Sequence, residues 1–192
     1  HMKRNCKLDE NYFLVSQEIN SDAIVEIAKS VNHIIVIDVS GSMSHDLPLI
    51  RTQLKNKLSN LIKGESDTVS IVWFSGNNES GILKEEVEVK SLKALNDLNE
   101  AIDKWLRPIG LTAFHKPLVL VKEIIERIKK NRPNSVHSLL FFTDGCNNNC
   151  SWGDVIKALK NLENDLISST FIEYGFYCNS ETVVEKFIDR HN

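Results

Sequence analysis

The sequence predicts an α/β fold with a doubly wound, mostly parallel sheet, one antiparallel edge strand and helices on both faces. Short runs rich in Ile, Val and Phe alternate with longer segments whose apolar residues recur every three or four positions, the pattern of strands separated by amphipathic helices. The run from His33 to Asp38 is almost continuously apolar, as in a strand buried on both faces. One link between strands is too short for a helix, so it predicts a hairpin and an antiparallel edge.

The first half of the domain is expected to contain this central strand, one helix and the hairpin. Apolar residues from Leu47 to Ile62 recur at spacings of three and four, which predicts a helix, and Gly64 is typical of its end. A second strand follows at residues 68–75. After a short turn, residues 82–89 form a third strand, whose many Lys and Glu residues suit an exposed edge.

The second half continues the alternation of helices and strands. Apolar residues from Leu92 to Leu106, Trp105 included, mark a helix that Pro108 and Gly110 end. Another helix is expected at about residues 113–130. The later elements are a strand at 136–142, a helix at 154–162, a strand at 167–176 and a final helix at 182–190.

The N-terminal part of the chain has the weakest pattern. We expect residues 1–32 to be a lead-in segment and residues 33–192 to form the α/β domain. Within the lead-in, Tyr12–Val15 is compatible with a strand, and residues 23–28 with a short helix or a second strand. His1-Met2 resembles the remnant of an expression tag, so the natural N-terminus is left open.

Composition narrows the function classes. A chain of 192 residues with 42% hydrophobic residues is long enough for one domain with a sizeable core. Its net charge of -3 and lack of a basic cluster argue against nucleic-acid binding, and no apolar run is long enough to cross a membrane. Four cysteines do not make a disulfide framework, so we expect a reducing, cytoplasmic setting.

The polar residues that matter most follow the central strand directly. Asp38, Ser40 and Ser42 alternate within five residues and supply one carboxylate and two hydroxyls. Gly41 lets the backbone bend so that these oxygens can converge. Converging hard oxygens suit a hard cation, with Mg²⁺ the first expectation and Mn²⁺ or Ca²⁺ as alternatives.

Asp38-Val39-Ser40-Gly41-Ser42 resembles the DxSxS signature of von Willebrand factor A (vWA) domains, which opens their metal-ion-dependent adhesion site (MIDAS). Two later loops match the rest of that site in family order: Gly110-Leu111-Thr112-Ala113 and Phe142-Thr143-Asp144-Gly145. The resemblance covers about residues 33–178 and implies a Rossmann-like vWA fold. The metal ligands that it implies are Asp38, Ser40, Ser42, Thr112 and Asp144.

The resemblance also implies a function and a partner. A divalent cation bound at the MIDAS would be completed by an Asp or Glu carboxylate from a protein partner, in a non-enzymatic interaction module or adaptor. The oligomeric state is left open. Family members usually carry one more strand and helix at the C-terminus than this chain shows. Either the sequence stops short of them, or the segment at Tyr12–Val15 supplies the missing edge.

Two other functions remain as alternatives. Asp38 could be the nucleophile of a Mg²⁺-dependent phosphotransferase or hydrolase, although no phosphate-binding Gly-rich loop or nucleophile elbow accompanies it. A metal-free scaffold is the third interpretation, because Asp and Ser after a strand are often only helix caps. The presence of all five implied ligands argues against the scaffold.

Three cysteines lie near the predicted site, and their role is left open. Cys146 and Cys150 follow Asp144 directly, and Cys178 follows the next strand. A zinc site would need a fourth ligand. A Cys146–Cys150 disulfide would need an oxidising setting, so reduced loop thiols are the expectation.

Two histidines and two apolar residues also lie in or beside the predicted loops. His45 and His115 could bond to a partner carboxylate but are expected to be ordinary loop residues. Met43 and Trp152 could form part of an apolar rim, with packing at the base of its helix favoured for Trp152.

Overall fold

The computed structural model describes residues 2–9, 12–18, 30–61, 66–77 and 79–174. Its strands are β1 (Met2–Asp9), β2 (Tyr12–Glu18), β3 (Ser30–Asp38), β4 (Thr68–Phe74), β5 (Ser80–Glu88), β6 (Ser135–Thr143) and β7 (Leu166–Tyr174). Its helices are α2 (Leu47–Leu61), α3 (Leu92–Trp105), α4 (His115–Asn131) and α5 (Trp152–Leu162), with the 3-10 turns η1 (Gly41–Ser44) and η2 (Glu163–Asp165).

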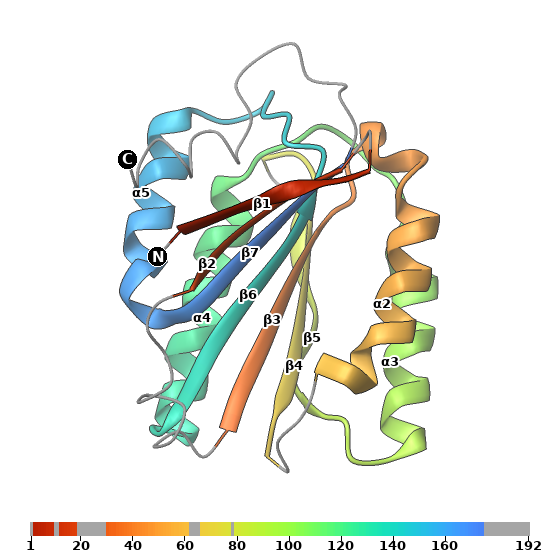
Figure 1. The fold of residues 1–192 in the computed structure, drawn as a ribbon, viewed down its shortest axis with the longest axis vertical. Coiled ribbons are helices and arrows are strands. Elements are labelled where there is room, and N and C mark those ends of the chain that lie inside the picture. Colours follow the sequence, from red (N-terminus) through yellow and green to blue (C-terminus); the bar gives the residue numbers. More distant parts are fainter. Residues whose placement is uncertain (1, 10–11, 19–29, 62–65, 78, 175–192) are drawn as a thin grey trace.

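The strands form one sheet in the order β1-β2-β7-β6-β3-β4-β5 (Figure 1). β7, β6, β3 and β4 are parallel neighbours, and β5 runs antiparallel to β4 at the edge. The predicted fold class is therefore confirmed. Its elements between residues 30 and 174 begin and end within three residues of the expected positions.

The N-terminal segment extends the sheet on the other side. β2 pairs antiparallel with β7 from Tyr12 opposite Tyr174 to Glu18 opposite Ser168, and β1 pairs antiparallel with β2. The segment at Tyr12–Val15 thus supplies an edge of the sheet, which was one of the two alternatives that the sequence left open, and β1 adds an antiparallel strand that was not expected. The boundary at residue 32 stays a prediction, and residues 23–28, Cys178 and the expected helix at 182–190 lie outside the described residues.

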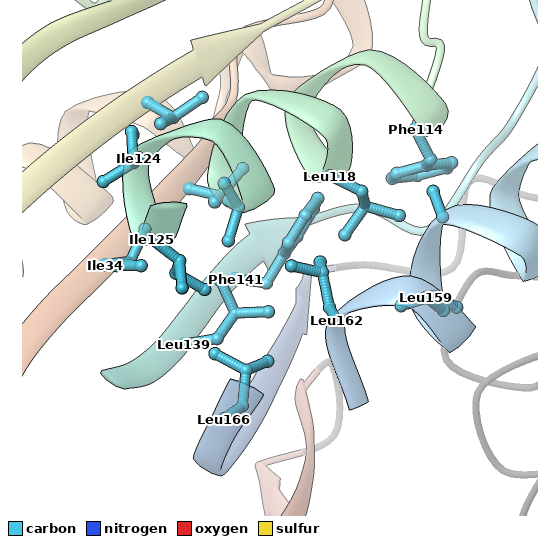
Figure 2. Close-up of a cluster of buried hydrophobic side chains, with 14 of the residues drawn as sticks. Ile34, Phe114, Leu118, Ile124, Ile125, Leu139, Phe141, Leu159, Leu162 and Leu166 are labelled. Atoms are coloured by element: carbon cyan, nitrogen blue, oxygen red, sulfur yellow. The ribbon is translucent and has the colours of Figure 1, made fainter. Parts of the chain in front are cut away.

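Two apolar layers hold the helices to the sheet. The α4 and α5 side packs on Ile34 and Val36 of β3, and the α2 and α3 side packs on Ile35 and Ile37. Figure 2 shows the first layer, in which side chains of α4 and α5 meet those of β3 and β6. Successive β3 side chains point to opposite faces, so both faces of this strand are covered by helices, as its sequence predicts.

The helix predicted from Leu92 to Leu106 is present, but its apolar stripe is not fully covered. Leu98 and Ile102 are buried, whereas Leu92 at the start and Trp105 at the end are exposed. The periodicity therefore located the helix correctly but wrongly suggested that the apolar residues at its two ends are buried.

No helix in the described part of the chain combines the length and the apolar character needed to cross a membrane.

Candidate metal centre

The sheet topology places the predicted ligands at one end of the molecule. Asp38 is the last residue of β3, Asp144 directly follows β6, and these two strands are parallel neighbours. Their carboxyl ends therefore lie side by side, at the end of the sheet where doubly wound folds bind ligands (Figure 1). Both carboxylates are almost completely buried, with 0% of Asp38 and 1% of Asp144 exposed.

The turn after β3 orients Asp38 and the two serines. Both carboxylate oxygens of Asp38 accept hydrogen bonds, Oδ1 from the Ser40 backbone N–H at 2.8 Å and Oδ2 from the Thr143 hydroxyl at 2.7 Å. The Ser40 and Ser42 hydroxyls lie 3.1 Å apart, within hydrogen-bond distance. Ser40 is buried and Ser42 is exposed, so this pair of oxygens leads from the carboxylate to the surface.

The loop that carries Thr112 is held against this turn by its backbone. Ile109 N–H donates to Val39 O at 2.6 Å, and Gly41 N–H donates to Gly110 O at 3.1 Å. Gly110 has φ +60°, and a Cβ there would come within 2.7 Å of Ser75 Oγ, so the position requires glycine. These bonds fix Thr112, which is 1% exposed, beside the Asp38 turn.

Two asparagines connect Thr112 to the Asp144 loop. They were not among the residues expected from the sequence, where the neighbouring cysteines drew attention instead. The Thr112 N–H donates to Asn148 Oδ1 at 2.9 Å. The Thr112 carbonyl accepts from the N–H groups of Asn148 and Asn149 at 3.2 and 3.0 Å. The backbone of Thr112 is therefore held in place from both sides. The clue in the sequence was the Asn run itself, because Asn side chains often bond to neighbouring backbone in turns.

The electrostatics of the two carboxylates are unusual. Burial raises the pKa of Asp38 to about 7, with the Asp144 charge adding to the rise, while hydrogen bonds from Ser40 and Thr143 offset part of it. Asp144 Oδ1 accepts from the Cys146 N–H at 3.1 Å. Asp144 Oδ2 is buried and has no hydrogen-bond partner among the described residues. A buried anionic oxygen without a hydrogen-bond partner is costly unless water or a ligand satisfies it.

Comparison with known proteins gives this geometry a family. The family model of the von Willebrand factor type A domain matches residues 33–187. The chain belongs to the vWA family. Domains of this family are commonly interaction or adhesion modules, are generally non-enzymatic, and often bind a divalent metal at a MIDAS.

Solved structures agree with the assignment at the level of the fold. A von Willebrand factor type A protein from Catenulispora acidiphila has a TM-score of 0.59 and 16% identity, covering 81% of this chain and 34% of its own. The pilus adhesin SpaC from Lactobacillus rhamnosus GG, in its open conformation, has a TM-score of 0.51 and 18% identity, covering 75% and 18%. This chain thus spans about a third or less of these proteins. No curated protein matches the chain in sequence.

A further carboxylate in this vWA domain was missed by the sequence analysis. Asp46 lies four residues after Ser42, and its Oδ2 is buried without a hydrogen-bond partner in the described part of the chain. Burial and the Asp144 charge raise its pKa, while His45 opposes the rise. Its carbonyl accepts the Ile50 N–H at 2.9 Å, as expected of a residue that caps the start of α2. An acid at that position has an ordinary structural explanation, so its place in the sequence did not mark it as part of a site.

The donor set fits a hard cation. Within the residues that the structure describes, no group of three or more His, Cys, Asp or Glu side chains is arranged to hold a metal ion. A cation here would therefore depend on serine and threonine hydroxyls together with the two carboxylates. Such an all-oxygen set suits Mg²⁺ better than zinc, which prefers Cys and His.

Among the described residues, Cys146 and Cys150 belong to no metal-binding group of side chains and form no disulfide with each other. Both are half-buried. The Cys150 thiol donates to Asn147 Oδ1 at 3.0 Å, which helps to shape the loop.

Met43 does not contribute to an exposed apolar edge of the site, and Trp152 packs at the base of its helix, as favoured from the sequence. Met43 is 0% exposed and belongs to the core on the α2 side, and Trp152 stacks on Phe114 with ring centroids 6.2 Å apart. Of the two histidines, His45 is exposed, and His115 is half-buried with Nδ1 lacking a partner among the described residues. Burial, followed by the charge of Lys116, lowers the pKa of His115.

Proposed function

We propose that this vWA domain is a metal-dependent protein-binding module. A divalent cation, best matched by Mg²⁺, with Mn²⁺ or Ca²⁺ as alternatives, binds at the end of the sheet. The proposed ligands are Asp38, Ser40, Ser42, Thr112 and Asp144. The cation supplies a coordination position that a hard anionic oxygen fills, so the partner contributes an Asp or Glu carboxylate.

One observation carries the proposal. Asp144 Oδ2 is buried and without a hydrogen-bond partner among the described residues, next to a second buried carboxylate whose pKa its charge raises. The Ser40 and Ser42 hydroxyls lead from that pair of carboxylates to the surface. A buried pair of like charges has no structural benefit by itself, but it is the arrangement that a divalent cation stabilises.

We propose no catalytic role for Asp38. A nucleophilic carboxylate needs an oxygen that can reach a substrate. Both oxygens of Asp38 accept hydrogen bonds, and the residue is 0% exposed. The proposal includes an adaptor role in a reducing, cytoplasmic setting.

The first test is calorimetric titration of the chain with MgCl₂ and MnCl₂ in the presence of acetate. The turn after β3 offers a matched pair of variants, because Ser42 and Ser44 are exposed hydroxyls two residues apart. We expect Ser42→Ala to weaken cation binding by more than roughly tenfold, and Ser44→Ala to leave it unchanged. Equal binding by wild type and Ser42→Ala, or no binding by wild type, contradicts the proposal. A pull-down from lysate with and without EDTA then identifies the partner.

A further inference from the structure

The end of α3 and its link to α4 expose three large apolar side chains at the end of the molecule that carries the candidate metal centre. Trp105, Ile109 and Leu111 are 60%, 41% and 52% exposed. We call these three residues the apolar rim. The α3–α4 link crosses the same end of the sheet as the turn after β3 (Figure 1).

The exposure of Ile109 and Leu111 follows from the hydrogen bonds that build the site. The Ser75 hydroxyl contacts the carbonyls of both residues, and the Gly110 carbonyl between them accepts the Gly41 N–H. Because the polar backbone atoms of the loop are directed into the protein, the two flanking side chains remain outside. Gly41 lies between Ser40 and Ser42, so the backbone between Ile109 and Leu111 lies next to the turn that carries the proposed hydroxyl ligands.

The chain segment that carries the apolar rim is basic. From Lys104 to Lys122 the chain contains no Asp or Glu, although its net charge is -3. Lys104 and Arg107 are exposed, and neither forms an ion pair with any described residue. The Lys104 ammonium lies 4.9 Å from the centroid of the Trp105 ring.

Two acidic residues also lie near this segment. Asp103, just before the link, pairs with Lys55 at 2.7 Å. Glu79 lies against Gly110 from the side of the β4–β5 turn. The basic residues Lys104 and Arg107 thus occupy the α3 side of the apolar rim.

We propose that the partner segment is both acidic and apolar: an extended peptide with an Asp or Glu for the cation, apolar side chains for the rim, and further acidic residues for Lys104 and Arg107. The inference rests on the proposed function and adds to it the composition of the partner. Two observations favour this occupant: the basic residues beside the rim complement acidic side chains, and the loop of the rim lies next to the turn that carries the proposed hydroxyl ligands. A second copy of the chain is net acidic, but it would have to present acidic and apolar side chains together on one surface.

The test is selection of a displayed random-peptide library on the immobilised 192-residue chain in Mg²⁺, with elution by EDTA. The same selection is run on three variants: the double variant Ile109→Ser/Leu111→Ser, the control Leu92→Ser, and Asp144→Asn. Leu92 is a matched control because it is 79% exposed and lies at the start of α3, away from the site. Calorimetry with MgCl₂ checks that the double variant still binds the cation.

We expect wild type and Leu92→Ser to enrich peptides in which acidic residues alternate with or adjoin apolar ones. The double variant should bind these peptides roughly tenfold more weakly while keeping its Mg²⁺ affinity. Enrichment of acidic peptides without apolar residues, or equal binding by the double variant, overturns this inference and leaves the proposed function standing.

Two other outcomes are also decisive. If EDTA elutes no enriched peptides from wild type, and Asp144→Asn gives the same result, both the proposed function and the inference are rejected. Sedimentation that shows a dimer of wild type and a monomer of the double variant assigns the apolar rim to self-association, which also overturns the inference.

Discussion

Replacing Asp144 by Asn should stabilise the metal-free protein and abolish its response to Mg²⁺. In the metal-free protein two buried carboxylates lie close together, and burial with the Asp144 charge raises the pKa of Asp38 from 3.8 to about 7. Asn has nearly the same shape as Asp but carries no charge, and its amide can donate to a neighbouring carboxylate. The variant thus removes a repulsion and adds a donor.

The magnitude follows from the pKa of Asp38. A pKa of about 7 in place of 3.8 corresponds to roughly 4 kcal/mol that ionised Asp38 costs the folded state. Burial is the largest cause of the rise and the Asp144 charge the second. We therefore expect Asp144→Asn to recover a minority of the cost, about 1–2 kcal/mol, or an increase in Tm of about 2–8 °C for a domain of this size.

The sign of the pH dependence gives a second readout. Because the folded-state pKa of Asp38 is raised, the folded state holds a proton that the unfolded state has lost between about pH 4 and 7. The stability of the metal-free wild type should therefore fall as the pH rises through this window. Without the Asp144 charge the fall should be smaller, so the advantage of Asp144→Asn should grow from about pH 5 to pH 8.

The assay is urea or thermal unfolding in EDTA and in excess MgCl₂, with Asp97→Asn as the control. Asp97 is exposed on α3 and pairs with Lys93, so its loss should change stability little in either buffer. Wild type should gain about 2.7 kcal/mol at a Mg²⁺ concentration a hundred times Kd, and Asp144→Asn almost nothing. If Asp144→Asn is less stable than wild type in EDTA, or gains as much from Mg²⁺, the reasoning is refuted.

Three further substitutions test other parts of the structure. Asn148→Ala leaves the buried Thr112 N–H without its side-chain acceptor and should cost about 1–3 kcal/mol in urea unfolding and weaken Mg²⁺ binding in calorimetry. Gly110→Ala places a Cβ at φ +60° within 2.7 Å of Ser75 Oγ and should cost about 1–2 kcal/mol by the same unfolding assay. His137 is buried, has no hydrogen-bond partner among the described residues, and has a pKa that burial lowers to about 4. His137→Leu should therefore gain about 2 kcal/mol over wild type as the pH falls from 6.5 towards 4, and an advantage that is constant with pH would contradict this.

The helices and strands could be predicted because each is encoded by the spacing of apolar residues within its own stretch of sequence. The spacing of apolar residues located α2 and α4 to within two residues, and the continuous apolar run identified β3 as a strand covered on both faces. The fold class followed from the alternation of these elements. The resemblance to vWA domains predicted which loops would meet, and the topology brings the ends of β3 and β6 together.

The rest depends on contacts that no local pattern encodes. β2 pairs with β7 across about 150 residues, and a strand's own sequence does not specify its partner. Ile109, Leu111 and Trp105 are apolar, so periodicity treats them as candidates for the core, and only the hydrogen bonds of the link show that they stay outside. Asp46 was missed because an acid at the start of a helix has a sufficient local explanation.

The distribution of charge argues that these deviations belong together. The chain has 23 Lys and Arg residues, yet it leaves Asp144 Oδ2 and Asp46 Oδ2 buried without a hydrogen-bond partner among the described residues. Elsewhere it pairs its acids readily, as Asp165 does with Lys122 and Lys129. Apolar side chains lie exposed at the same end of the sheet. Buried carboxylate oxygens without described partners and exposed apolar side chains thus occur together at this end of the sheet, and the combination supports the proposed ligand, which is acidic and apolar and binds through a cation.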